Sequence, residues 1–210
     1  MHWLADLFLA SIGKKLLMAL TGLCFCAFLA VHLAGNLTLY AGSGAFNAYA
    51  EHLHALGPLL LVMEWGMLFF ALVHVGTGLT LFVQNLRARP SRYAVNRAGG
   101  GRTPGSRTMP YTGVVLLGFV ILHLLDFHFI DKGGRTIYQI VTATFADPVW
   151  VGLYVLAMAA AFLHLSHGFW SAFQSLGAIN PRLTWPLYSL ALVLALALAA
   201  GYIIIPVYLF

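Results

Sequence analysis

Charged side chains are scarce in this chain, and their scarcity excludes most classes of soluble protein. Only 8% of the 210 residues are Asp, Glu, Lys or Arg, whereas 61% are hydrophobic. Soluble domains carry about 25% charged residues. The composition therefore indicates an integral membrane protein, and the length suits a single transmembrane domain over residues 1–210 rather than several domains.

Cysteine is nearly absent as well. Cys24 and Cys26 are the only two, and they lie two residues apart in an apolar run, where a helix would point them to different faces. This spacing argues against a disulfide or a metal site, and we expect both to be small buried hydrophobic side chains. The chain also lacks the C-x-x-C-H order that attaches haem covalently.

Long apolar runs are what the sequence does contain. A helix needs about 20 mostly apolar residues to cross a membrane, and five stretches qualify: 14–36, 58–86, 110–130, 148–176 and 184–209. Pro58, Pro110 and Pro148 precede or open three of them, as expected of proline in a first helical turn. No cleavable signal pattern precedes the first stretch, so we expect it to remain as a span. The sequence predicts an all-α bundle of five transmembrane helices.

The basic residues predict the orientation of this bundle. Nine of the eleven would lie on one side of the membrane: Lys14, Lys15, Arg87, Arg89, Arg92, Arg97, Arg102, Arg107 and Arg182. By the positive-inside rule that side is cytoplasmic, together with the N-terminus. We therefore interpret the net charge of +5 as topology and not as a sign of nucleic-acid binding.

Two connecting segments differ in kind. Residues 87–109 form a basic, glycine-rich loop that would meet soluble partner subunits or anionic lipid, or simply remain solvated. Residues 41–57 begin with glycines that predict a turn, and they continue as a short amphipathic helix on the outer surface.

Four histidines within the spans fall at two depths. With a rise of 1.5 Å per residue, His32 and His123 lie about 12 Å from the outer boundary, and His74 and His164 lie about 24–25 Å from it. His74 follows His32 by 42 residues and His164 follows His123 by 41, which indicates two copies of one helical hairpin. Two imidazoles at one depth, from different helices, predict the axial ligands of a haem iron, so we expect two haems of b type.

Neighbouring residues refine this expectation. Gly78 and Gly168 each follow an inner histidine by four residues, one turn along the same face, and would leave room for a flat porphyrin; Gly35 and Gly118 flank the outer histidines. His167 has no partner at its depth, so we expect a packing hydrogen bond or a place near the haem edge. His128 would lie at the outer interface.

These residues resemble a known family. The stretches that carry the resemblance are FLAVHL, GSGAFNAYAEHL, ALVHVGTG, TGVVLLGFVILHL and FLHLSHGFWS, and they run from about residue 12 to the end. The chain is similar to the dihaem cytochrome b anchor subunit of succinate:quinone oxidoreductases, which include succinate dehydrogenase and quinol:fumarate reductase. The resemblance implies that His32 and His123 bind a distal haem, and that His74 and His164 bind a proximal one.

The resemblance also implies partners and a place in the cell. A flavoprotein with FAD and an iron–sulfur subunit would dock on the cytoplasmic face of a bacterial inner membrane, in a respiratory complex for which a dimer is one option. This chain would react with menaquinone and carry electrons, without succinate or fumarate chemistry of its own. Whether the complex oxidises succinate or reduces fumarate stays open.

Two positions depart from the family pattern. Some members carry an essential glutamate in the outer segment as quinol proton acceptor; here the ungapped register places His54 there, with Glu51 one turn earlier. We expect one of the two to act, and we favour Glu51. A half-buried glutamate can have a raised pKa, and histidine as a residue type titrates near neutral pH. Phe162 stands where some members have a proton-carrying glutamate, so the proton path is left open.

Two carboxylates within the spans are further candidates, because an intramembrane carboxylate suggests function by default. Glu64 lies in the outer half of the second span and Asp126 lies one turn after His123. For each the alternative is a hydrogen bond to a neighbouring helix or a lipid headgroup. Rival functions for the whole chain are the cytochrome b subunit of a hydrogenase or formate dehydrogenase, and a haem-free transporter or assembly protein.

Overall fold

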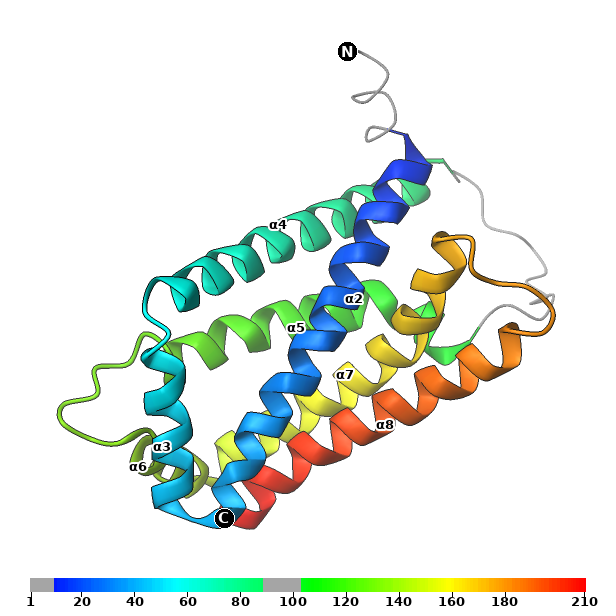
Figure 1. The fold of residues 1–210 in the computed structure, drawn as a ribbon. Coiled ribbons are helices and arrows are strands. Elements are labelled where there is room, and N and C mark those ends of the chain that lie inside the picture. The colour runs from blue at the N-terminus through cyan, green and yellow to red at the C-terminus, as the bar shows by residue number, and fades with distance from the viewer. Residues whose placement is uncertain (1–9, 89–102) are drawn as a thin grey trace.

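The structure is a computed structural model that describes residues 10–88 and 103–210, and within these ranges every regular element is helical. Five helices are long and apolar enough to cross a membrane. They are α2 (Ser11–Asn36), α4 (Pro58–Arg87), α5 (Pro104–Phe127), α7 (Pro148–Ser175) and α8 (Thr184–Leu209), and Figure 1 shows them as one elongated bundle. The prediction of an all-α, multi-pass membrane bundle is confirmed.

The helix ends agree with the predicted spans within three residues except at the start of α5. That helix begins at Pro104, six residues before the predicted start, and Pro110 lies inside it. Thr103 explains the earlier start, because its side chain accepts a hydrogen bond from the Ser106 amide and caps the helix ahead of a proline at the first helical position. Four of the predicted inner-side arginines, Arg89, Arg92, Arg97 and Arg102, lie outside the described residues.

Three shorter helices lie at one end of the bundle. The predicted outer segment folds as η1 (Leu37–Ala41) and α3 (Ser43–His54), joined at Gly42, whose φ of 94° suits glycine. The third, α6 (Ile137–Phe145), was not predicted, although Thr136 and Gln139 form a capping box at its start. The Asn47 side chain accepts a hydrogen bond from the Tyr138 amide, which ties α3 to α6. Figure 1 shows these two helices at the same end of the bundle.

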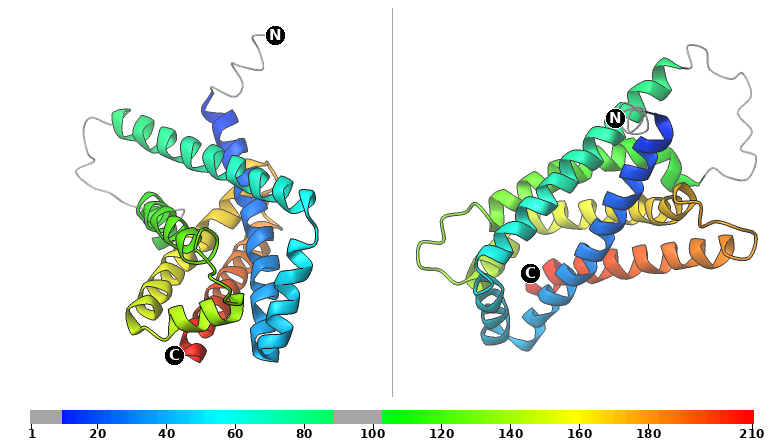
Figure 2. Two further views of the ribbon diagram at one scale, coloured as in Figure 1. Left: turned by 90° about the vertical axis from the view of Figure 1, so that its left-hand side faces the viewer. Right: turned by 45° about the horizontal axis from the view of Figure 1, so that its top comes forward.

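Helix α7 is the centre of the packing. It contacts α8, α5 and α2 extensively, whereas α4 packs mainly along α2 and touches α5 at few residues. Figure 2 shows the two hairpins α2–α4 and α5–α7, with α8 beside α7. Many large apolar side chains point outward, as expected for helices that face lipid. Of the two cysteines, Cys26 is buried as expected, but Cys24 is exposed.

Small residues allow α8 to lie close to its neighbours. Ala191 and Ala195 are 0% exposed, and a Cβ atom on Gly201 would meet Leu33 Cδ2 at 2.6 Å. Such small-residue contacts are how transmembrane helices approach closely without a hydrophobic driving force. The largest buried cluster gathers at the α3–α6 end, around Leu39, Phe46, Val141, Phe145, Tyr154 and Ile205.

Candidate functional site

The four histidines at two depths come together as two pairs. The ring centroids of His32 in α2 and His123 in α5 are 5.9 Å apart, and those of His74 in α4 and His164 in α7 are 6.4 Å apart. We call His32 and His123, which lie nearer to α3 and α6, the outer pair, and His74 and His164 the inner pair. Each pair draws its members from two different hairpins, as the depth argument predicts.

His74 is held by a threonine of its own hairpin. Its Nδ1 atom lies 3.0 Å from Thr21 Oγ1, while that hydroxyl donates to the Leu17 carbonyl at 2.7 Å. A hydroxyl has one hydrogen, so Thr21 accepts at His74, and Nδ1 carries the proton. The lone pair of the neutral ring is therefore on Nε2, where it is available to a metal.

His164 repeats this arrangement in the second hairpin. Its Nδ1 atom lies 3.1 Å from Thr112 Oγ1, and the Thr112 hydroxyl donates to the Thr108 carbonyl at 3.0 Å. The same counting of hydrogens leaves the His164 lone pair on Nε2. Both threonines are buried, at 5% and 6% exposure, so water does not compete for these contacts.

His123 is held by a phenol instead. Its Nδ1 atom lies 3.2 Å from the hydroxyl oxygen of Tyr154, and this hydroxyl donates to Asp126 Oδ2 at 3.4 Å. The phenol oxygen therefore accepts from His123, and Nε2 again holds the lone pair. Asp126, a candidate on sequence grounds, thus has the alternative role of a hydrogen-bond acceptor on a neighbouring helix.

His32 is positioned by aromatic contacts. Its ring stacks on Phe28, with centroids 5.3 Å apart and planes 13° from parallel, and it lies 6.1 Å from the ring of Tyr202. Among the described residues its ring makes no hydrogen bond. Tyr202 itself donates to the Leu29 carbonyl at 2.7 Å, which connects α8 to α2 beside His32.

The histidine pairs fit the axial ligands of haem iron. Two metal–imidazole bonds of about 2 Å placed end to end set the ring centroids roughly 6 Å apart, and both observed separations are close to that value. In the described residues no group of three or more His, Cys, Asp and Glu side chains is placed to hold a metal ion. Two imidazoles are too few for the four-ligand structural site of zinc, but they suffice where a macrocycle supplies the remaining nitrogens.

Two glycines were expected to make room for porphyrin, and each of them lies opposite a methionine of its own hairpin. A Cβ atom on Gly78 would lie 3.7 Å from Met18 Sδ, and one on Gly168 would lie 3.8 Å from Met109 Cε. Both distances are ordinary van der Waals contacts, so the absent side chains leave space next to a flexible methionine. Gly35 is different, because a Cβ atom there would collide with the ring of Tyr49 in α3.

Among the residues at the inner pair that sequence reasoning missed, four repeat between the two hairpins. They are the two threonines already described and the glycine after each of them: Thr21, Gly22, Thr112 and Gly113. A Cβ atom on Gly22 would lie 3.3 Å from Cε1 of His74, and one on Gly113 would lie 3.5 Å from Cε1 of His164. The repeated Thr-Gly dipeptide, 91 residues apart, is the signal that would have identified them.

The candidate proton acceptors lie on or near α3. Glu51 is exposed, not half-buried as expected, and His54 is exposed with Nδ1 2.7 Å from the Ala50 carbonyl, to which it donates. Glu64, in α4, is half-buried and makes no hydrogen bond to the described residues. In the second hairpin the corresponding position, 90 residues later, is Tyr154.

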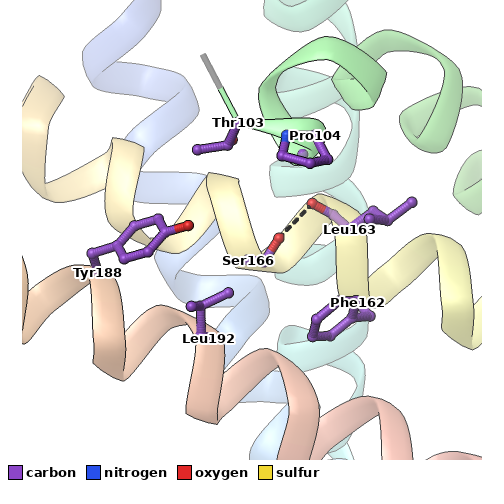
Figure 3. A pocket seen from close by; sticks show the side chains of 8 residues that line it. Thr103, Pro104, Phe162, Leu163, Ser166, Tyr188 and Leu192 are labelled. Carbon is purple, nitrogen blue, oxygen red and sulfur yellow. Dashed lines mark hydrogen bonds between the residues drawn. The ribbon is translucent and has the colours of Figure 1, made fainter. Parts of the chain in front are cut away.

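His128 is exposed, as expected for an interfacial position. His167 makes no packing hydrogen bond through Nδ1, which is buried without a partner in the described part of the chain. Phe162 lines a cavity of about 200 Å³ between α7, α8 and the start of α5, with Ser166 and Tyr188 nearby (Figure 3). The hydroxyl of Ser166 donates to the Leu163 carbonyl, so it does not point a free donor at Phe162.

No protein-family profile, no curated protein and no solved structure matches this chain.

Proposed function

We propose that this chain is the dihaem cytochrome b anchor subunit of a succinate:quinone oxidoreductase. One observation carries the proposal: two histidine pairs, drawn from four transmembrane helices, each have centroids about 6 Å apart. Hydrogen bonds at Nδ1 of three of the four rings support it, because metal-binding histidines usually donate their other ring nitrogen to an acceptor.

The chain's own residues would hold the cofactors and set their surroundings. His32 and His123 would hold the distal haem, and His74 and His164 the proximal one. When bound, each haem supplies a one-electron carrier whose potential depends on its axial ligands and their hydrogen bonds. The apolar helices around both pairs would keep water away from the imidazoles.

The two ends of the bundle would have different tasks. At the α3–α6 end, Glu51 or His54 would take a proton from menaquinol beside the outer pair. At the other end, Lys14, Arg107 and Arg182 would lie on the cytoplasmic side, where a flavoprotein and an iron–sulfur subunit would dock. This arrangement would connect menaquinone to the soluble subunits across a bacterial inner membrane.

The orientation can be tested with single cysteines introduced into the Cys24→Ala, Cys26→Ala background. A membrane-impermeant maleimide added to whole cells should label Gly133→Cys, between α5 and α6. It should label Ala178→Cys, between α7 and α8, only after the cells are opened. The reverse pattern would overturn the proposed topology.

The haem assignment is tested with purified protein. Reduced-minus-oxidised spectra should show b-type haem at two per chain, and His164→Ala should leave one. His167→Ala, three residues away in the same helix, is the matched control and should keep both. A wild type without haem would favour the hypothesis of a transporter or assembly protein. Two haems in His164→Ala would disprove the ligand assignment.

The runner-up is the cytochrome b subunit of a hydrogenase or formate dehydrogenase. Both hypotheses include haem, and they differ in the soluble partner subunits and hence in the substrate of the complex. Copurification followed by assays with succinate, fumarate, formate and hydrogen separates them: turnover of succinate or fumarate supports our proposal, and turnover of either of the other two contradicts it.

A further inference from the structure

The two hairpins share more than their histidines. Six positions in α2 recur in α5 at an offset of 91 residues: Met18, Thr21, Gly22, Phe28, His32 and Leu33 recur as Met109, Thr112, Gly113, Phe119, His123 and Leu124. The inner histidines follow nearly the same offset, because His164 comes 90 residues after His74. The repeated residues therefore include both threonines and both glycines that touch the inner pair from α2 and α5. Phe25, whose ring centroid lies 5.6 Å from that of His74, is not repeated, because Leu116 stands at the corresponding position.

The contacts repeat along with the residues. In each hairpin the threonine hydroxyl meets Nδ1 of the inner histidine, at 3.0 Å for Thr21 and 3.1 Å for Thr112. In each hairpin the imidazole lies against the glycine that follows the threonine. A Cβ atom on Gly22 would be a tight 3.3 Å from Cε1 of His74, and one on Gly113 would make an ordinary contact of 3.5 Å with Cε1 of His164. Two hairpins of different sequence thus hold their inner histidines in the same way.

Helix association alone does not account for this arrangement. A threonine–histidine hydrogen bond can join two membrane helices, but here both hydroxyls have their hydrogen committed to a carbonyl of their own helix. Each oxygen can then only accept, and this requires the Nδ1–H form of the histidine. The consequence is one tautomer and one ring orientation on both sides of the inner pair.

We propose that Thr21 and Thr112 are positioning residues for the inner haem, each fixing the tautomer and the direction of the histidine that binds its iron. This inference rests on the proposed function. An acceptor on Nδ1–H raises the basicity of the other ring nitrogen, and the loss of such a partner typically weakens metal binding about 10- to 100-fold. A more basic ligand also favours the oxidised iron, so losing the acceptor should raise the potential.

Valine substitutions test this proposal, because valine keeps the shape of threonine and removes the hydroxyl. In Thr21→Val and in Thr112→Val we expect one of the two haems to bind about tenfold more weakly when the purified apoprotein is titrated with haem. In samples loaded with excess haem, the midpoint potential of that haem should shift upward while the other stays unchanged. Thr21→Ser and Thr112→Ser, which restore the acceptor, should return both values to wild type.

Matched controls come from threonines with the same backbone hydrogen bond but no histidine. Thr108, one turn before Thr112, donates to the Pro104 carbonyl, and Thr80 in α4 donates to the Gly76 carbonyl. Thr108→Val and Thr80→Val should change neither haem affinity nor potential. A shift of the same size in these controls would assign the effect to helix stability and overturn the proposal.

The outcomes separate this inference from the proposed function. If the wild type binds two haems and the valine variants keep both potentials and affinities, the positioning role is wrong and the dihaem assignment stands. If the serine variants behave like the valine variants, the hydroxyl is not the group that matters, and the proposal also fails. A wild type without haem would disprove the proposed function, and this inference with it.

Discussion

Tyr154 connects His123 to a carboxylate on the same helix as His123. Its phenol oxygen lies 3.2 Å from Nδ1 of His123 and 3.4 Å from Oδ2 of Asp126. Tyr154 is 7% exposed, so these contacts are formed away from bulk solvent. One member of the outer pair, His123, is therefore hydrogen-bonded, through a phenol, to an acidic group, whereas both members of the inner pair are hydrogen-bonded to neutral threonines.

We predict that Tyr154→Phe alters the outer haem and leaves the inner one intact. The change removes the acceptor of His123 Nδ1–H, and an unsatisfied buried donor costs about 1–3 kcal/mol. Potentiometric titration should show an upward shift of one midpoint potential. Tyr188→Phe is the control, because no hydrogen bond involves the Tyr188 hydroxyl within the described residues, and an equal shift in both variants would contradict the prediction.

We predict that the histidines lose haem as two pairs. In His32→Ala or His123→Ala the remaining imidazole cannot hold the outer haem alone, so each single variant should lose that haem. The double variant His32→Ala/His123→Ala affects the same haem twice and should still retain the other one. By contrast, His32→Ala/His74→Ala should retain none, because each pair loses a member. Haem-to-protein ratios of the purified variants give the measurement, and loss of both haems in the first double variant would refute the pairing.

We predict that Gly35→Ala destabilises the docking of α3 on α2. The added methyl group would meet the ring of Tyr49, and overpacking of this kind costs about 1–3 kcal/mol. Thermal unfolding in detergent should show a lower midpoint, and removing the ring with Tyr49→Ala should relieve part of the loss. Gly152→Ala in α7, where a Cβ atom meets nothing within 4 Å, should not lower the midpoint.

We predict that Glu51→Gln reduces quinol oxidation roughly 100-fold or more, the scale of a lost general base, while haem content stays normal. His54→Gln tests the other candidate in the same assay. His52→Gln, an exposed histidine between them in α3, is the matched control and should keep full activity. If Glu51→Gln is fully active and His54→Gln is not, the proton acceptor is His54.

Several features of the fold could be read from the sequence because they depend on local chemistry. The apolar runs and the prolines at 58 and 148 predict the helix starts correctly, because both signals are local to one helix. The length of a run sets how far its helix extends, and proline suits the first turn because the amide hydrogen that it lacks has no partner there. The start of α5 predicted from Pro110 was wrong, because Thr103 caps the helix and Pro104 occupies its first position six residues earlier. The short helix α6 was not predicted, although the sequence contains its capping box at Thr136 and Gln139.

The sequence by itself determined that four histidines lie at two depths in a five-helix membrane bundle, because helical rise and hydropathy fix depth without knowledge of packing. Only the tertiary structure decided what surrounds each ring. Thr21, Thr112 and Tyr154 reach their histidines across 31 to 53 residues of chain, and such contacts depend on how neighbouring helices are rotated and how closely they approach. Depth is a property of one helix, whereas a hydrogen bond between side chains requires two helices to be packed in register.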